Sequence, residues 1–130
     1  MLVPASHLDL LERPILGHLA TIGADGGPEV APVWFGWDGE VIKVSSLQTR
    51  QKVRNLQRNP GASLLVVDPD DDYRYIELRG RVVRMEEDLD HAYIDEMAKR
   101  YLRVDSYPWQ RPGDRRVVLE LRPERVRTLG

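Results

Sequence analysis

Apolar and polar residues alternate along most of this 130-residue chain, and the alternation predicts a protein built mainly of strands. The apolar runs are separated by turn-forming residues, such as "ADGG" at 24–27 and "DG" at 38–39, which indicate hairpins. Pro32 favours an edge strand, and Gly80 favours a bulge or bend within a long strand. We predict six strands, at 15–23, 28–37, 40–46, 62–68, 73–85 and 115–129.

Three further segments have helical spacing, and we predict helices at 6–14, 49–60 and 86–102. The second helix places Val53 and Leu56 on one face. The third places Leu89, Tyr93 and Met97 at i, i+4 and i+8, as an apolar stripe would require. Strands joined mostly by hairpins, with three short helices, predict a mainly β protein. Its antiparallel sheet would form a small, closed or partly closed barrel in one domain covering residues 1–130.

Composition and charge narrow the classes of partner. The chain has 19 basic and 21 acidic residues, a net charge of −2 that argues against bulk attraction to nucleic acid or to a membrane surface. No apolar run approaches the ~20 residues of a membrane span, and the N-terminus lacks the order of a signal peptide. Cysteine is absent, which excludes disulfides and thiolate chemistry. We therefore expect a cytoplasmic protein.

The common catalytic motifs are missing from the sequence. The three histidines, at positions 7, 18 and 91, have no spacing that would form a metal site, and no nucleophile elbow, P-loop or dinucleotide fingerprint occurs. If the protein is an enzyme, we expect a cofactor to carry the reaction.

One stretch of the chain is strongly basic. "TRQKVRNLQR" at 49–58 contains four cations, and helical spacing divides them, because Arg50, Arg54 and Arg58 share one face whereas Lys52 lies beside the apolar one. Arg54 and Arg58 are most simply a solvated face. Arg50 and Lys52 differ, since they begin a helix that follows a strand.

The start of this helix has the chemistry of an anion site. Ser45 and Ser46 end the preceding strand, so hydroxyl groups, helix amides and the cations Arg50 and Lys52 converge there. Cations in a first turn also oppose the helix dipole unless an anion neutralises them. We predict a phosphate at this corner. Aromatic residues that could contact a flat ring are Trp34, Tyr73 and Tyr75, whereas Phe35 and Trp37 are explained equally well by packing.

The ordered set of the "HLATIGADGGPEVAPVWFGW" hairpin, the "KVRNL" helix and the later "RG" strand resembles the pyridoxamine 5′-phosphate oxidase-like split-barrel superfamily. It most resembles the branch of flavin and deazaflavin oxidoreductases that use coenzyme F420. The resemblance covers roughly residues 10–128. It implies a six-stranded antiparallel split β-barrel of the FMN-binding type, and a homodimer with two cofactor sites at its interface.

The same resemblance implies roles for particular residues. Ser45, Arg50 and Lys52 match phosphate-holding positions, and Asn55 matches a polar position beside them. Residues 33 and 34, Val and Trp, match the strand that lies along the deazaflavin ring. Aromatic positions of the same pocket are matched by Tyr73 and Tyr75.

The implied reaction is hydride transfer between reduced deazaflavin and an unsaturated or conjugated small organic molecule. Two alternatives stay open at this point. The cofactor could instead be FMN, whose phosphate binds a comparable strand-to-helix corner elsewhere in the superfamily. The protein could also be a non-enzymatic carrier of a flavin or deazaflavin, because the sequence shows no acid–base pair.

Overall fold

Seven antiparallel strands form one sheet in a computed structural model of the chain, which describes residues 2–130. Along the sheet the strands follow the order β2-β1-β5-β6-β7-β4-β3, and every pair of neighbours is antiparallel, as predicted. The strands are β1 (Gly17–Ile22), β2 (Pro28–Val33), β3 (Gly36–Trp37), β4 (Ile42–Leu47), β5 (Gly61–Asp68), β6 (Asp71–Glu87) and β7 (Arg116–Leu129).

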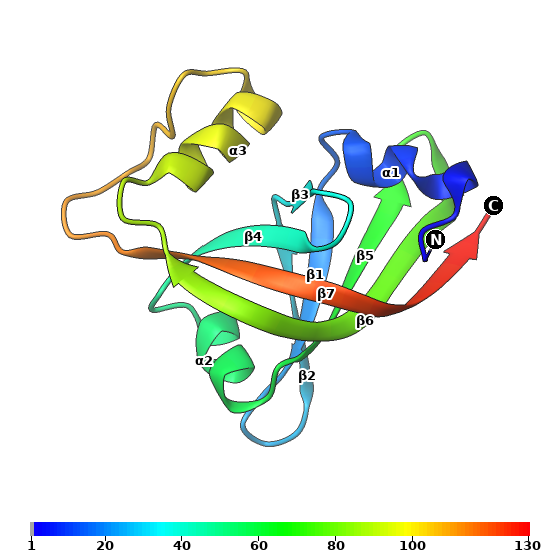
Figure 1. Cartoon of the computed structure of the whole chain (residues 1–130), viewed down its shortest axis with the longest axis horizontal. Coiled ribbons are helices and arrows are strands. Elements are labelled where there is room, and N and C mark those ends of the chain that lie inside the picture. Colours follow the sequence, from blue (N-terminus) through cyan, green and yellow to red (C-terminus); the bar gives the residue numbers. More distant parts are fainter. Residues whose placement is uncertain (1) are drawn as a thin grey trace.

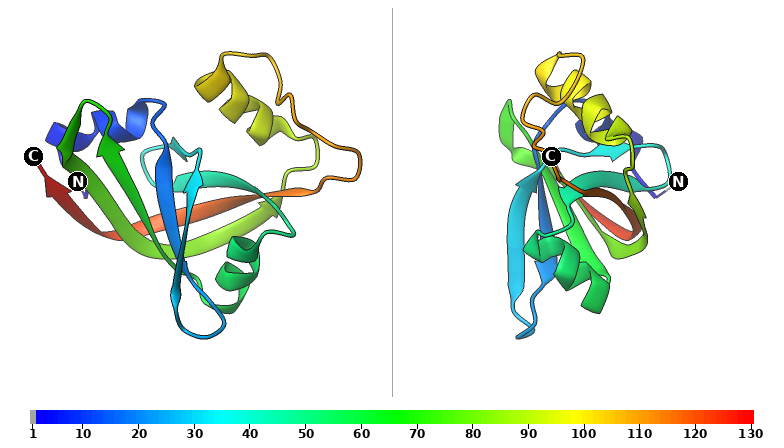
Figure 2. Two further views of the ribbon diagram at one scale, coloured as in Figure 1. Left: turned by 180° about the vertical axis from the view of Figure 1, so that it is seen from behind. Right: turned by 90° about the vertical axis from the view of Figure 1, so that its left-hand side faces the viewer.

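The sheet bends strongly so that its two halves face each other across one core. Figure 1 shows β4, β6 and β7 crossing in front of β1, β2 and β5, and Figure 2 shows the same crossing from behind. Alternate residues of β1, β4 and β5 are buried, which is the pattern of strands with one face on a core. The fully buried side chains include Phe35, Ile42, Leu64, Leu78 and Leu119. The mainly β, barrel-like class predicted from the sequence is confirmed.

The number of strands differs from the prediction because the segment 28–37 is divided. Its first part, β2, pairs with β1 at one edge of the sheet, and its last part, β3, pairs with β4 at the other edge. Residues 34 and 35 therefore cross from one edge to the other. Pro32 does lie in an edge strand, as predicted, which is where proline is tolerated in a sheet.

Gly80 marks a shift in the pairing of β6 with β7, in agreement with the predicted bulge. A Cβ atom at Gly80 would lie 1.9 Å from the carbonyl oxygen of Arg122, so only glycine permits the close approach of the two backbones. The bulge bends the longest strand of the sheet, and the bend helps the sheet to close on itself.

Residues 2–130 also form four helical segments: η1 (Ala5–His7), α1 (Asp9–Glu12), α2 (Gln51–Arg58) and α3 (Ala92–Leu102). The third predicted helix begins later than expected, because Glu86 and Glu87 continue β6. Leu89 is consequently 77% exposed and not part of the apolar stripe. The residues that α3 buries are instead Ile94, Met97 and Ala98. No helix within residues 2–130 is long and apolar enough to cross a membrane.

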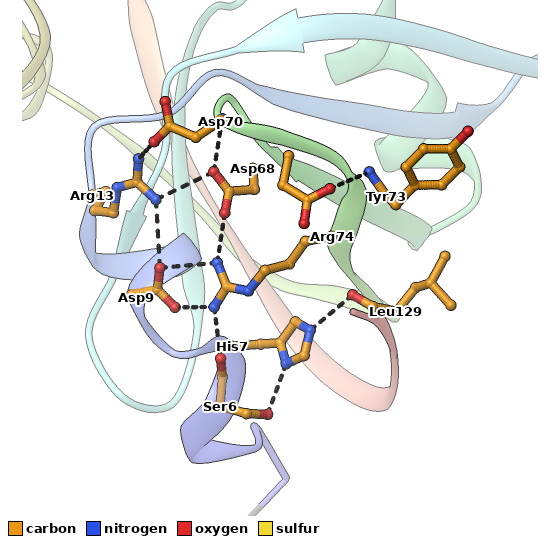
Figure 3. A network of polar contacts seen from close by, with 10 residues as sticks. Ser6, His7, Asp9, Arg13, Asp68, Asp70, Tyr73, Arg74 and Leu129 are labelled. Carbon is orange, nitrogen blue, oxygen red and sulfur yellow. Dashed lines mark hydrogen bonds and ion pairs between the residues drawn. The ribbon is translucent and has the colours of Figure 1, made fainter.

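A polar network fastens the N-terminal segment to the hairpin between β5 and β6 (Figure 3). The guanidinium of Arg74 donates to Asp68 at 2.8 Å and to both carboxylate oxygens of Asp9. Arg74 thereby lowers the pKa of Asp9, whereas the pKa of Asp68 is lowered first by the backbone amide of Asp70 and then by Arg74. The network joins α1 to the sheet at the opposite end of β6 from α3.

Near this network the buried ring of His7 connects both ends of the chain. Its Nε2 hydrogen-bonds to the carbonyl oxygen of Leu129 at 2.9 Å, and its Nδ1 to the hydroxyl group of Ser6 at 2.8 Å. Ser6 therefore orients His7, and neither η1 nor α1 has a side-chain cap.

Candidate functional site

The predicted anion site lies where β4 ends and α2 begins. Ser45 and Ser46 are adjacent in β4, so their side chains point to opposite faces of the sheet. Ser46 is 3% exposed and donates to the carbonyl oxygen of Leu47, whereas Ser45 faces a cavity. Arg50 is the N-cap residue of α2 and makes no side-chain cap bond. The corner therefore offers one hydroxyl group, that of Ser45, rather than two.

Three cations, Arg50, Lys52 and Arg116, gather at this corner, and Glu29 lines a small cavity beside the first two. Lys52 is half-buried, and its pKa is lowered from the ordinary value by burial first, and then by the charges of Arg50 and Arg116. Within residues 2–130, no Asp or Glu forms an ion pair with any of the three. Cations brought together where water is partly excluded repel one another unless an anion binds between them. The corner is thus electrostatically suited to a phosphate.

Arg116, the first residue of β7, was not identified from the sequence. It is only 7% exposed, and its Nη1 donates to the hydroxyl oxygen of Ser45 at 3.3 Å. Its guanidinium carbon lies 4.8 Å from the centre of the Tyr107 ring, a cation–π contact. Its Nε is buried and has no hydrogen-bond partner among the described residues. A buried N–H donor without an acceptor is costly, so this atom also indicates an anionic ligand.

A cavity of about 340 Å³ opens beside the corner and contains four of the predicted site residues: Val33, Trp34, Ser45 and Lys52. Arg50 lines a neighbouring cavity of about 240 Å³, which shares Lys52 with the first. The two hollows thus meet at Lys52. Elements that are far apart in the sequence complete the larger one, which is also lined by Ile94, Met97, Tyr107, Trp109 and Arg116.

Aromatic rings form one side of this cavity. Trp34 stacks on Tyr101, with ring centres 5.2 Å apart and planes 10° from parallel. The hydroxyl group of Tyr101 donates to the carbonyl oxygen of Ile15 at 2.8 Å, and burial raises the pKa of this phenol. Tyr107 meets both Trp34 and Trp109 edge to face, at 6.2 and 5.6 Å. Trp34 is therefore held firmly, and a flat ligand would find an aromatic surface beside a phosphate-binding corner.

Tyr107 and Trp109 belong to the segment 103–115, which connects α3 to β7 beside the cavity (Figure 1). The sequence predicted neither a helix nor a strand at 103–114. Its aromatic residues were missed because neither hydrophobic periodicity nor a motif marks them. A weak signal was available in "YPW", two aromatic residues within a polar loop.

Three other predicted residues lie away from the cavity. Asn55 is fully buried, and its amide nitrogen donates to the hydroxyl oxygen of Thr21 at 3.0 Å, so it attaches α2 to β1 rather than contacting a ligand. Tyr73 is 80% exposed, and Tyr75 pairs with Leu129 at the opposite end of β6. Neither tyrosine lines the cavity of its own chain.

The remaining helix cations behave as the solvated face that the sequence suggested. Arg54 and Arg58 are exposed. Arg54 donates to the carbonyl oxygen of Thr49, and Arg58 donates to the side-chain oxygen of Asn55 at 3.1 Å. Among residues 2–130, no group of three His, Cys, Asp or Glu side chains is placed to hold a metal ion.

Three larger hollows lack the features of this corner. One, of about 400 Å³, lies against β1 and β5, where Arg79 and Arg125 are exposed and Glu124 is beside them. A second, of about 480 Å³, lies on β6 and β7, and its arginines are exposed. The third, of about 550 Å³, lies between the N-terminal segment and β3. None of the three is lined by a buried, unpaired cation among the described residues, so we place the candidate site at the cavity of about 340 Å³.

Comparison with known proteins identifies the family of the chain and several similar proteins. The sequence model of the family described as pyridoxamine 5′-phosphate oxidase matches residues 3–130. An F420H(2)-dependent biliverdin reductase of Mycobacterium tuberculosis is 33% identical over 121 residues, which cover 92% of this chain and 82% of the relative. A solved structure of an F420 reductase is 41% identical, with a TM-score of 0.87, over 96% of this chain and 98% of that chain. A conserved hypothetical protein of M. tuberculosis is 25% identical, with a TM-score of 0.77, over 99% of this chain and 85% of that chain.

Proposed function

The chain belongs to the pyridoxamine 5′-phosphate oxidase family, and from that premise we propose that it is a coenzyme F420-dependent reductase of unsaturated or conjugated organic molecules. The observation that carries the proposal is the unpaired cation cluster of Lys52, Arg50 and Arg116 beside an aromatic-lined cavity. The choice of cofactor is supported by two relatives whose names include F420, one of which also names biliverdin, a conjugated molecule.

The residues present fit a phosphorylated, flat cofactor. We assign its phosphate to Ser45, Lys52 and Arg116, with Arg50 at the edge, because these side chains supply hydroxyl and cationic donors. Glu29 also lines the smaller cavity, but among the described residues it forms no ion pair with these cations. We assign the ring to the stretch at Val33 and Trp34. When bound, the reduced deazaflavin supplies the hydride.

The work of the chain itself is to orient both reactants and to exclude water from between them. Ile94 and Met97, which α3 buries against the cavity, make part of its lining apolar. The described lining contains no Asp, Glu or His, so no acid–base pair faces the cavity. A proton that must accompany the hydride would come from solvent or from Tyr107, which lines the cavity.

We further propose that two copies of the chain complete the site. The cavity of about 340 Å³ lies at the low end of the usual range for small-molecule sites, which is roughly 300–1,000 Å³. The outward faces of β1 and β5 also carry half-exposed apolar side chains: Ala20, Ile22, Leu65 and Val67. A second copy packed on this face would bury them. Light scattering coupled to size-exclusion chromatography tests the dimer, and a monomer at micromolar concentration would contradict it.

The choice of cofactor is tested by calorimetric titration of the purified protein with coenzyme F420 and, separately, with FMN. We expect micromolar binding of F420 and weaker binding of FMN. Tighter binding of FMN would overturn the choice of cofactor and leave the location of the site standing.

The absence of an acid–base pair from the lining also favours a second candidate, a carrier that binds the cofactor without turnover. The two are separated by mixing the protein with reduced F420 and a panel of quinones, enones and tetrapyrroles, and following reoxidation of the cofactor by absorbance. Reoxidation that depends on the protein supports the reductase. Binding without turnover across the panel would support the carrier.

A further inference from the structure

Arg116 is placed to do more than hold a phosphate. Its guanidinium bonds to Ser45, 71 positions earlier in the chain, and its flat face lies over the ring of Tyr107. One side chain thus joins the anion corner to the segment 103–115. Its unpartnered Nε shows that the protein alone does not satisfy this buried group.

A small number of contacts hold the segment 103–115 in place near Tyr107. The backbone amide of Tyr107 donates to a carboxylate oxygen of Asp95 on α3 at 2.8 Å, which fixes the main chain. The ring of Tyr107 is fixed by Arg116 on its face and by Trp34 at its edge. Trp109 is 59% exposed, and Tyr107 is its only aromatic neighbour among the described residues. Tyr107 thus contacts both the guanidinium of Arg116 and the ring of Trp109, and so connects the two.

We propose that Arg116 is at once a ligand of the bound anion and the support of the pair Tyr107–Trp109, so that anion binding orders the aromatic wall that contacts a flat substrate. An anion that accepts hydrogen bonds from the guanidinium holds it in one orientation. Because the guanidinium is planar, holding its edge also fixes the face on which Tyr107 lies. The proposal deepens the proposed function and rests on it only for the identity of the substrate.

The coupling is tested without F420, using inorganic pyrophosphate as the anion and tryptophan emission as the readout. Pyrophosphate should bind the wild-type protein in calorimetry and change its emission saturably. Trp109→Phe should retain binding and lose most of the emission change. The matched control, Trp37→Phe, removes a tryptophan that packs against the core in β3 and should keep the change.

Variants of Arg116 separate its two roles. Arg116→Met should weaken pyrophosphate binding by about tenfold or more, since it removes charge-assisted bonds. Arg116→Lys keeps the charge but loses the planar face, so it should bind pyrophosphate measurably with little change of emission. If the Arg116 variants do not fold, as judged by circular dichroism, Tyr107→Leu replaces them, because it leaves the cation in place. This variant should bind the anion without an emission change.

Several results would overturn the inference. These are an absence of pyrophosphate binding to the wild type, an unchanged affinity in Arg116→Met, an emission response that persists in Trp109→Phe, or a full response in Arg116→Lys or Tyr107→Leu. Failure of F420 and FMN to bind would instead refute the proposed function and leave these measurements valid. The role proposed for Arg116 and the proposed function can therefore be refuted independently.

Discussion

Replacing Lys52 by methionine should have opposite effects on ligand binding and on the stability of the ligand-free protein. Lys52 lies where two cavities meet, with Arg50 and Arg116 near it, and it forms no ion pair with a carboxylate among residues 2–130. A charge-assisted hydrogen bond contributes about 1.5–3 kcal/mol, so its loss should weaken F420 binding roughly 10- to 150-fold. Methionine has a similar length and keeps the packing of the lysine stem.

The ligand-free protein should become more stable in the same variant. The pKa of Lys52 is lowered from its ordinary value of 10.5, chiefly by burial, so the folded state disfavours the charged form. Protonation of Lys52 is therefore more favourable in the unfolded chain than in the folded chain. The charge of Lys52 thus lowers the free energy of unfolding, and this effect is fully present at neutral pH. Stabilisation by Lys52→Met should therefore be fully present near pH 7, fade as the pH rises through the lowered pKa of Lys52, and be absent above about 10.5.

Calorimetric titration with F420 and urea unfolding without ligand measure the two effects. Lys99→Met is the matched control, because Lys99 is exposed on α3 and outside both cavities. It should leave affinity and stability nearly unchanged. An unchanged F420 affinity in Lys52→Met, together with a lower free energy of unfolding, would refute the reasoning, since it would show that Lys52 is neither a ligand of the phosphate nor an uncompensated charge.

Three further expectations concern the frame around the site. Arg74→Met should lower the free energy of unfolding at pH 6. That loss should shrink as the pH falls below the ordinary aspartate pKa of 3.8 and through the lowered pKa values of Asp9 and Asp68, because a protonated carboxyl group is no longer stabilised by the charge of Arg74. A loss independent of pH in urea titrations would contradict the network. Gly80→Ala should destabilise the protein by roughly 1–3 kcal/mol, since its Cβ would meet a backbone carbonyl 1.9 Å away; unchanged thermal unfolding would show that the two strands can separate. Tyr101→Phe should cost about 1–2 kcal/mol and weaken F420 binding through a looser Trp34, whereas normal affinity would show that Trp34 does not depend on this bond.

Much of the fold was predictable because its signals are local. Strand alternation and turn residues located the long strands, and Pro32 and Gly80 marked the edge and the bulge correctly. The miscounted strand has a clear cause. Residues 28–37 look continuous in hydrophobicity, but they pair with β1 at one end and with β4 at the other. A pattern along the chain does not show where the pairing partner changes.

Only those site residues that lie close together in the sequence could be predicted as one site. Ser45, Arg50 and Lys52 could be grouped because they lie within eight positions of one another, at a strand-to-helix junction. Ser46 was grouped with them by proximity in sequence, although strand alternation turns its side chain to the interior. Asn55 was placed beside the phosphate, but its amide is used inside the protein.

By itself, the sequence determined a cysteine-free, mainly β chain with a basic helix start, since periodicity, turn chemistry and charge are properties of neighbouring residues. Only the tertiary structure decided that Arg116 would join Ser45 and that Tyr107 and Trp109 would stand beside Trp34. The physical reason is the register of β4 on β7, which pairs Leu47 with Arg116 and so places the arginine diagonally from Ser45. That register is set by the packing of the whole sheet around its core, which no local pattern encodes.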